Sequence, residues 1–368
     1  MDRPVDARRT VDGPRDRLRY PRSLVNPSDE PLPSVSVVVV AYGPEDWLAR
    51  SVDAVLASEG VRADVIVVDN GGTGDLVDRV ATRPGVTVIR PGRNTGFAGG
   101  CNLGAAAAGG ELLALVNPDA IVGPRALAEL VAVASEPDVG IATACVRLAD
   151  HPDLLNSAGN MIHFLGVSWA GHFEEPVADH RERRPATAAS GAAMVLRRDW
   201  WEHLGGLCEP FFAYYEDADL SLRSWQQGRS VVYVPTAEVV HRYEFSRNAI
   251  KFRLLERNRL AMALSSFSAR HLLLTLPLLL GLELGILAYA AKQGWWREKL
   301  ASYRWIWRRR DWLRQRRSEL AAERLRSERD LAHLYSAHLD PKNIGLPDFV
   351  RPIDRVMAAY WRLVRRAI

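Results

Sequence analysis

The stretch GGELLALVNPDA, residues 109–120, decides the fold that this sequence predicts. Residues 111–116 form a short apolar run that is typical of a buried strand. Asn117-Pro118-Asp119 then stops the strand, because proline cannot donate into a β-ladder and a Pro-Asp pair favours a turn. The carboxylate of Asp119 is therefore expected at the C-terminal end of a strand, where ligands bind in open α/β sheets. An acid at this place can hold a divalent cation, although an ordinary βα turn uses the same residue types.

Length and composition describe a folded globular chain. The chain has 368 residues, of which 48% are hydrophobic and 25% are charged, enough for one large domain with an appendage or for two domains. A net charge of only +4 gives no reason to expect a nucleic-acid partner. The three cysteines, Cys101, Cys145 and Cys208, lack the spacing of a zinc site or a disulfide framework, which favours a reduced, intracellular protein.

Strands and helices alternate on both sides of the 109–120 stretch. Residues 35–41 are an unbroken, mostly β-branched run, which indicates a strand that is covered on both faces of a parallel sheet. Helical spacing follows over 45–58, and further short strands are predicted at 65–68, 86–89 and 231–235. This alternation predicts an α/β fold with a mostly parallel, doubly wound, Rossmann-like sheet.

Polar residues follow several of these predicted strands or lie in the adjoining loops. They are Tyr42, Asp69, Asn94 and Asp119. Because crossover connections place the C-terminal ends of parallel strands at one edge of the sheet, these side chains are expected to form one polar rim.

A glycine-rich segment, RNTGFAGGCN at 93–102, opens a helix that is predicted at 102–108. It lacks the GK[ST] of a P-loop, and it does not follow the first strand as a dinucleotide fingerprint does. Small residues here would let backbone N–H groups approach an anion, and Arg93 would add a cation. Glycines that only allow close helix packing would give the same pattern.

Three acids occupy four positions after a run of aromatic residues, at Glu216, Asp217 and Asp219. Acids in the first turn of a helix complement its dipole, which would explain Glu216 and Asp219 without any chemistry. The aromatic neighbours of Asp217 favour a raised pKa and a fixed position, as a general base needs. His241 ends a later apolar run and could reach the rim, although single histidines are often structural.

The remainder of the chain combines a basic helix at 250–267 with an apolar stretch at 272–291. That stretch has roughly the ~20 residues that span a bilayer, but Pro277 and Glu283 interrupt it. A spanning helix, a helix or bent hairpin in the membrane interface, and a buried soluble helix all fit this pattern. Five of the 11 tryptophans lie at 295–312 among arginines, which favours a membrane surface over a nucleic-acid patch or a solvated helix.

Together these motifs resemble the family 2 glycosyltransferases, in the branch that includes bacterial rhamnosyltransferases. The resemblance covers about residues 35–258, and the order and spacing of the motifs make it specific. The matching segments are VSVVVVAYGPEDWLARSVDAV (35–55), VVDNGGTG (67–74), GRNTGFAGGCNLGAA (92–106), LVNPDA (115–120), SGAAMVLRR (190–198), FFAYYEDADLSLRSWQQG (211–228) and VVHRYEFS (239–246).

The resemblance implies a GT-A fold and the inverting transfer of a sugar from a nucleoside diphosphate donor. It implies a divalent metal, Mg²⁺ or Mn²⁺, at Asp119 and His241, with Asn117 in place of the first acid of the DxD motif. Asp217, with Glu216 beside it, matches the catalytic base. The donor-binding positions that the resemblance implies are Tyr42, Asp69, Asn70, Arg93, Asn94, Gly96, Asn117 and Asp119.

The resemblance favours dTDP-L-rhamnose as the donor and a lipid-linked or cell-surface glycan as the acceptor. The enzyme is then expected at the cytoplasmic face of the cell membrane, and Arg257 is expected to face a lipid phosphate of the acceptor. A UDP-hexose donor remains an alternative, as does a non-catalytic nucleotide-sugar-binding scaffold. The predicted domains are a disordered arm (1–33), a glycosyltransferase domain (34–248), a basic and apolar membrane-associating region (249–318) and a charged helical tail (319–368).

Overall fold

The computed structural model describes residues 31–243, 249–339 and 350–368. Contacts divide the chain into two units, Met1–Leu32 and Pro33–Ile368, and all elements described below belong to the second. The predicted disordered arm therefore lies almost entirely outside the described residues. The predicted borders at 248 and 318 fall inside the second unit, and helix α10 (Arg310–Ala322) runs across the later one.

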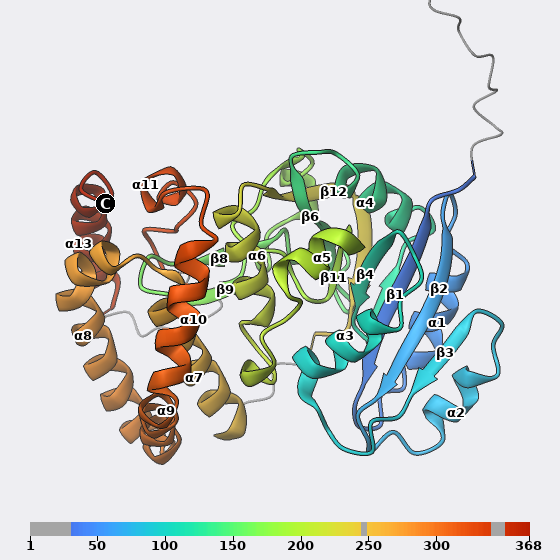
Figure 1. Ribbon diagram of the computed structural model, residues 1–368, viewed down its shortest axis with the longest axis horizontal. Coiled ribbons are helices and arrows are strands. Elements are labelled where there is room, and N and C mark those ends of the chain that lie inside the picture. The colour runs from blue at the N-terminus through green and yellow to red at the C-terminus, as the bar shows by residue number, and fades with distance from the viewer. Residues whose placement is uncertain (1–30, 244–248, 340–349) are drawn as a thin grey trace, which may run out of the picture. The chain divides into compact units, whose positions relative to one another are not determined.

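One mixed sheet forms the centre of this unit (Figure 1). Its strands are β1 (Ser34–Ala41), β2 (Arg62–Asp69), β3 (Val86–Ile89), β4 (Leu112–Val116), β5 (Ala120–Val122), β6 (Val139–Leu148), β7 (Leu155–Ser157), β10 (Arg184–Pro185), β11 (Ala193–Arg197) and β12 (Ser230–His241). The main path runs β10-β12-β6-β11-β4-β1-β2-β3, with β5 paired to β12 and β7 to β6. A separate hairpin contains β8 (Asn160–Ile162) and β9 (Ser168–Ala170).

The direction of the strands decides which residues meet at one edge of the sheet. Strands β1 to β4 run parallel, as the alternation of strands and helices predicts. Strand β11 runs antiparallel between β4 and β6, and β12 is parallel to β6. Two reversals restore the original direction, so β12 ends at the same edge as β1, β2 and β4. The predicted α/β, Rossmann-like fold with a mostly parallel sheet is confirmed.

Helices cover both faces of the sheet, because alternate residues of each strand point to opposite sides. Val37 and Val39 of β1 join one apolar cluster, whereas Val38 and Val40 join another. The first cluster also contains residues of α1 (Leu48–Leu56), α2 (Leu76–Ala81) and α4 (Ala126–Ala134). The second contains residues of α3 (Gly96–Ala106), α5 (Arg198–Leu204) and α6 (Glu216–Gln226).

The glycine-rich helix differs from its predicted bounds, since α3 begins at Gly96 and not at residue 102. A Cβ atom on Gly104 would lie 2.4 Å from Val38, and one on Gly100 would lie 2.7 Å from Val40. These glycines therefore let α3 pack closely against β1. For these two glycines the structure therefore supports close helix packing as the reason for the small residue.

Two further differences concern the second half of the sheet. The strand predicted at 231–235 is longer in the structure, since β12 runs from Ser230 to His241 with a register irregularity between Val234 and Glu238. Strand β6 was not predicted, although most of it is buried. Its sequence VGIATACVRL is rich in small residues, which carry little strand signal on their own.

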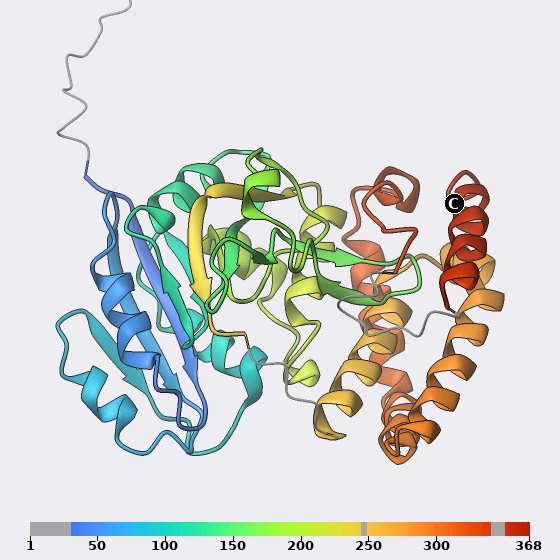
Figure 2. The same ribbon diagram turned by 180° about the vertical axis from the view of Figure 1, so that it is seen from behind.

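The C-terminal helices group together beside the sheet, as Figures 1 and 2 show from opposite sides. They are α7 (Ala249–Ser266), α8 (Ala269–Lys292), α9 (Trp296–Arg308), α10, α11 (Glu328–Leu331) and α13 (Val350–Val364). Helix α8 is continuous and contains Pro277, so the bent-hairpin alternative is wrong. Short 3₁₀ helices occur at Val177–Asp179 and Glu209–Phe211.

Candidate active site

Three predicted site residues meet where β4 and β12 end. Asn117 and Asp119 follow β4, and β12 pairs with β5 so that His241 lies opposite Ala120. The imidazole Nε2 of His241 lies 3.1 Å from Asp119 Oδ1 and 3.3 Å from Asn117 Nδ2. The sheet topology therefore brings together side chains that are more than a hundred residues apart in sequence.

Asn156, at the centre of β7, orients the imidazole of His241. The Nδ1 atom of His241 lies 2.9 Å from Asn156 Oδ1, which accepts a hydrogen bond when Nδ1 carries the proton. In that tautomer the electron pair of Nε2 faces a carboxylate oxygen of Asp119. An imidazole whose other nitrogen donates to an oxygen, next to a carboxylate, is a common arrangement for holding a divalent cation. The residues present therefore fit such an ion.

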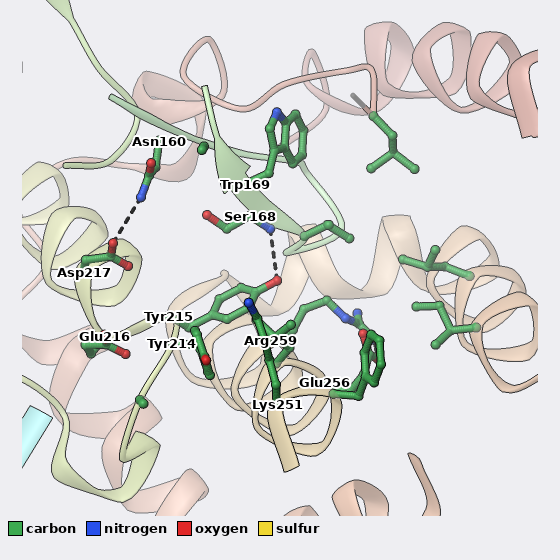
Figure 3. Close-up of a pocket in the computed structure, with 18 of the residues that line it drawn as sticks. Asn160, Ser168, Trp169, Tyr214, Tyr215, Glu216, Asp217, Lys251, Glu256 and Arg259 are labelled. Atoms are coloured by element: carbon green, nitrogen blue, oxygen red, sulfur yellow. Dashed lines mark hydrogen bonds and ion pairs between the residues drawn. The ribbon is translucent and has the colours of Figure 1, made fainter. Parts of the chain in front are cut away.

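Asp217 lies in the first turn of α6, which begins directly after Tyr215; the φ of 72° places Tyr215 in the left-handed region. The Oδ2 atom of Asp217 accepts a hydrogen bond from the backbone N–H of Gly191 at 3.0 Å. It accepts a second one from Asn160 Nδ2 at 3.1 Å, which Figure 3 shows. Gly191 precedes β11, whose antiparallel direction puts its start at the same edge of the sheet as the ends of β4 and β12. Two elements outside α6 thus fix the carboxylate.

The carboxyl groups of Glu216 and Asp217 have raised pKa values. Burial raises the pKa of Glu216 well above its ordinary value, and the neighbouring Asp217 raises it further. Burial also raises the pKa of Asp217, but the hydrogen bonds from Gly191 and Asn160 act in the opposite direction. Among the described residues the Oε2 atom of Glu216 has no hydrogen-bond partner. The donors around Asp217 therefore make it the member of the pair that ionises more readily.

A cavity of about 810 Å³ connects these two groups of residues. Asn117, Asn156 and His241 line it at the end of the strands, and Asn160, Glu216 and Asp217 line it at the start of α6. This volume lies in the upper part of the range for small-molecule sites. Asp119 is not among its lining residues, but it reaches the cavity wall through His241.

The remaining predicted donor-binding residues lie along the ends of β1, β2 and β3, outside the lining of this cavity. Tyr42, Arg93 and Asn94 are exposed. Asp69 caps its own turn, with Oδ1 accepting from Gly71 N and Thr73 Oγ1, each at 3.0 Å. The donor-binding role of these residues stays a prediction.

Asn70 and Gly96 have structural contacts that compete with a role in donor binding. Asn70 is 3% exposed; its Nδ2 donates to the carbonyl of Gly96 at 2.8 Å, and its Oδ1 accepts from Thr95. A Cβ atom on Gly96 would lie 2.3 Å from the carbonyl oxygen of Phe212. Both residues therefore join the start of α3 to neighbouring segments.

Arg257, predicted to face a lipid phosphate of the acceptor, has contacts within the protein, and its predicted role stays a prediction. Its Nη2 atom donates to the carbonyl oxygens of Pro210 and Phe211, and its guanidinium group lies over the ring of Trp305. It is not among the residues that line the cavity, whereas Lys251, also on α7, is. Arg257 therefore supports the segment that leads to α6, and the structure does not bring it to Asp217.

Asn258 holds the same segment from inside the protein. Its side chain is fully buried, and Nδ2 lies within 2.8–2.9 Å of the carbonyl oxygens of Phe211, Ala213 and Tyr214. Phe212, Tyr214 and Tyr215 all have positive φ values, which cost energy for residues with side chains. Asn258 therefore stabilises a strained turn that sets the direction in which Asp217 enters α6.

Sequence reasoning missed several residues of this site: Asn156, Asn160 and the positioning residue Asn258. Asn156 and Asn160 flank the short segment NSAGN, which reads locally as a loop. Asn258 lies inside a helix and resembles any polar helical residue.

Comparisons with known proteins identify relatives of this chain. An L-rhamnosyltransferase of Mycobacterium tuberculosis, N-acetylglucosaminyl-diphospho-decaprenol L-rhamnosyltransferase, is 29% identical over 56% of this chain and 75% of its own length. An O-antigen biosynthesis protein of Myxococcus xanthus is 30% identical over 63% of this chain, which covers 18% of that protein. An uncharacterised protein of Sinorhizobium fredii is 30% identical over 59% of this chain, which covers 25% of that protein.

A solved structure shares the fold. The crystal structure of GalNAc-T7 with UDP, GalNAc and Mn²⁺ matches 64% of this chain and 48% of that chain, with a TM-score of 0.53 and 19% sequence identity. The sequence model of the family described as "Glycosyltransferase like family 2" matches residues 33–263, more than half of the chain. This protein is therefore a member of glycosyltransferase family 2.

Proposed function

We propose that this protein is an inverting glycosyltransferase that moves L-rhamnose from dTDP-L-rhamnose to a lipid-linked or cell-surface glycan acceptor. The observation that carries the proposal is the position of Asp217, which is held by Gly191 and Asn160 in the cavity that Asn117 and His241 also line. A single in-line displacement needs a base at the attacking hydroxyl and charge stabilisation at the departing diphosphate. The two ends of the cavity offer these two functions.

Asp119 and His241 would hold a divalent cation, Mg²⁺ or Mn²⁺, which would neutralise charge on the departing diphosphate. GalNAc-T7, which shares the fold, was crystallised with UDP and Mn²⁺, and this supports the use of a divalent metal. Asp217 would take the proton of the acceptor hydroxyl. Gly191 and Asn160 would keep its carboxylate ionised and aimed at that hydroxyl.

The choice of sugar and acceptor rests on the relatives. The M. tuberculosis relative is named for L-rhamnose and for a sugar that is carried on diphospho-decaprenol, and the M. xanthus relative is named for O-antigen biosynthesis. An acceptor of this type is reached at a membrane. Leu273 and Leu284 on α8 are 70% and 69% exposed, and Trp307 on α9 is 66% exposed, which supports association with the cytoplasmic face of the cell membrane.

A panel of nucleotide sugars tests the donor. We expect dTDP-L-rhamnose to raise the melting temperature in the presence of Mn²⁺, because a ligand at a hundred times its Kd adds about 2.7 kcal/mol of stability. Slow release of dTDP from this donor, abolished by EDTA and restored by Mn²⁺, would show catalysis. If only UDP-hexoses stabilise the protein and are turned over, the donor is a UDP-hexose and not dTDP-L-rhamnose. Binding without any turnover would favour a nucleotide-sugar-binding scaffold.

The buried amide of Asn258 gives a second expected result. Asn258→Leu should lower kcat by about tenfold to a hundredfold and leave the KM for the donor unchanged, because small misplacements of a catalytic group cost that much. Gln315→Leu serves as the control, since Gln315 is an exposed amide whose side chain bonds only one turn away, to Glu319. A rise in donor KM with unchanged kcat would show that Asn258 does not act through Asp217.

A further inference from the structure

We propose that the apolar arm of the active-site cavity, enclosed by α7, α8 and α13, binds the hydrocarbon chain of a lipid-linked acceptor. The sugar that the lipid carries would then lie at Asp217. This inference rests on the proposed function and narrows the acceptor to an amphipathic molecule with a long chain. Free glycans and soluble sugars would lack the part that the apolar arm recognises.

The lining of the cavity changes in character along its length. Close to Asp217 it contains asparagine, serine and carboxylate side chains. Further away the walls are aliphatic and come from three helices. These residues are Leu255 on α7, Leu278, Leu282 and Ile286 on α8, and Ile353 and Met357 on α13. One continuous cavity therefore joins a polar reaction centre to an apolar arm, which matches a polar head attached to an apolar chain.

A buried cation lies between the two ends of the cavity, where an acceptor phosphate would come. Arg259 lines the cavity and is 1% exposed, and its Nη2 atom pairs with Glu256 and Glu283. Its Nε and Nη1 atoms have no hydrogen-bond partner among the described residues. Buried guanidinium donors are normally satisfied, so two unsatisfied donors on a residue of the cavity lining favour an anionic group such as a phosphate there. Lys251 lines the same part of the cavity and adds a second cation (Figure 3).

Helix α8 is apolar on two faces, and only one of them faces the cavity. Of its most apolar 18-residue window, 6% is buried. Leu280 and Leu284 on the outer face are 55% and 69% exposed. Glu283, the acid within this helix, points inward and pairs with Arg259 and Lys299, so it leaves the outer face apolar. A lipid chain in a bilayer that touches the outer face would need to pass only this one helix to reach the arm.

The part of the chain that encloses the arm lies mostly outside the matched family region. The family match ends at residue 263, whereas α8 and α13 begin at Ala269 and Val350. The proposed chain-binding arm is therefore a property of these added helices and not of the shared glycosyltransferase domain.

Two glycines make the arm testable. Gly281 and Gly285 of α8 line the cavity, and a Cβ atom built on either would meet nothing within 4 Å. Gly285→Phe should therefore fill the arm without a clash, and a helix interior tolerates the change because glycine is a poor helix former. Leu284→Phe places the same side chain on the outer face and is the matched control.

The experiment measures binding of lipid phosphates to the full-length protein in detergent, without any donor. The probes are a long polyprenyl phosphate, geranyl phosphate and inorganic diphosphate. We expect the wild type and Leu284→Phe to bind the long chain at least about tenfold more tightly than geranyl phosphate, since a few buried methylene groups are enough for that difference. Gly285→Phe should lose this preference and still bind geranyl phosphate.

Equal binding of long and short chains by the wild type would overturn the inference, as would an unchanged preference in Gly285→Phe. Equal loss in Gly285→Phe and Leu284→Phe would also overturn it, because the chain would then lie on the outer face. These outcomes are independent of turnover. Chain-selective binding in a protein that uses no nucleotide sugar would refute the proposed function and leave the lipid arm standing.

Discussion

Replacing Asp217 by asparagine is expected to lower kcat by about 10²–10⁴-fold, the usual contribution of a general base. The amide keeps the shape of the side chain and can still accept from Gly191 N–H, but it cannot take a proton. Donor affinity should stay unchanged, because the residues proposed to hold the metal and the diphosphate lie at the other end of the cavity. Steady-state kinetics with the best donor, together with donor titration of the inactive variant, measure both quantities.

Asp199→Asn is the control for this change, since the side chain of Asp199 is 62% exposed on α5 and, among the described residues, forms its ion pair with the nearby Arg197. It should keep wild-type turnover. Turnover of Asp217→Asn within tenfold of the wild type would remove Asp217 from the role of base and direct attention to Glu216.

The proposed role of Asp217 as the base also predicts how kcat changes with pH. Burial raises the pKa of both Asp217 and Glu216, so the pair holds protons at a higher pH than free carboxyl groups do. The base works only when it is ionised, and kcat should therefore fall as the pH decreases through this raised value. The acidic limb of the profile should disappear in Asp217→Asn.

Removing the carboxylate of Asp219 is expected to destabilise the folded protein by about 3–5 kcal/mol, because two buried cations lose their partner. Asp219 is fully buried; it pairs with Arg223 at 2.9 Å and with Arg316 of α10 at 2.5 Å. Burial alone would raise the pKa of Asp219, but the two arginines hold it below its ordinary value. Urea unfolding of Asp219→Ala near neutral pH measures the effect, and the difference from the wild type should shrink in acid.

Asp311→Ala is the matched control for this prediction. Asp311 also pairs with an arginine, Arg314, but its side chain is 76% exposed, so its loss should cost less than about 1 kcal/mol. Equal stability losses in the two variants would contradict a buried ion pair that joins α6 to α10.

Much of the fold could be predicted because its signals are local. The β-branched run at 35–41 and the Asn-Pro-Asp stop after 116 mark strands and their ends without knowledge of the rest of the chain. Strand β6 could not be predicted, because the residues of VGIATACVRL are selected by their packing against distant parts of the chain. A Cβ atom on Gly140, for example, would lie 2.0 Å from Ser224 Oγ, so only a glycine fits there. Such packing leaves little periodic pattern in sequence.

In the candidate site, too, the residues with a local sequence signal could be predicted and those placed by long-range contacts could not. The sequence predicts Asp119, His241 and Asp217 as site residues because each stands at an element boundary or beside aromatic residues. It cannot reveal that Asn156 orients one of them and Asn160 another, since each contact joins residues far apart in sequence and depends on the completed sheet. For Asp219 the local pattern gave an incomplete explanation. Its position in the first turn of a helix suggests an interaction with the helix dipole, whereas its partner Arg316 lies 97 residues away in sequence.

The contacts of Asn258 also have a practical meaning for protein engineering. The catalytic half of this enzyme depends on a side chain from the first C-terminal helix, so the boundary of an exchangeable module lies after α7 and not before it. A hybrid that joins this glycosyltransferase domain to the C-terminal helices of a relative should retain residues through Phe267. A junction at 248 would leave the carbonyl groups of Phe211, Ala213 and Tyr214 to a foreign helix.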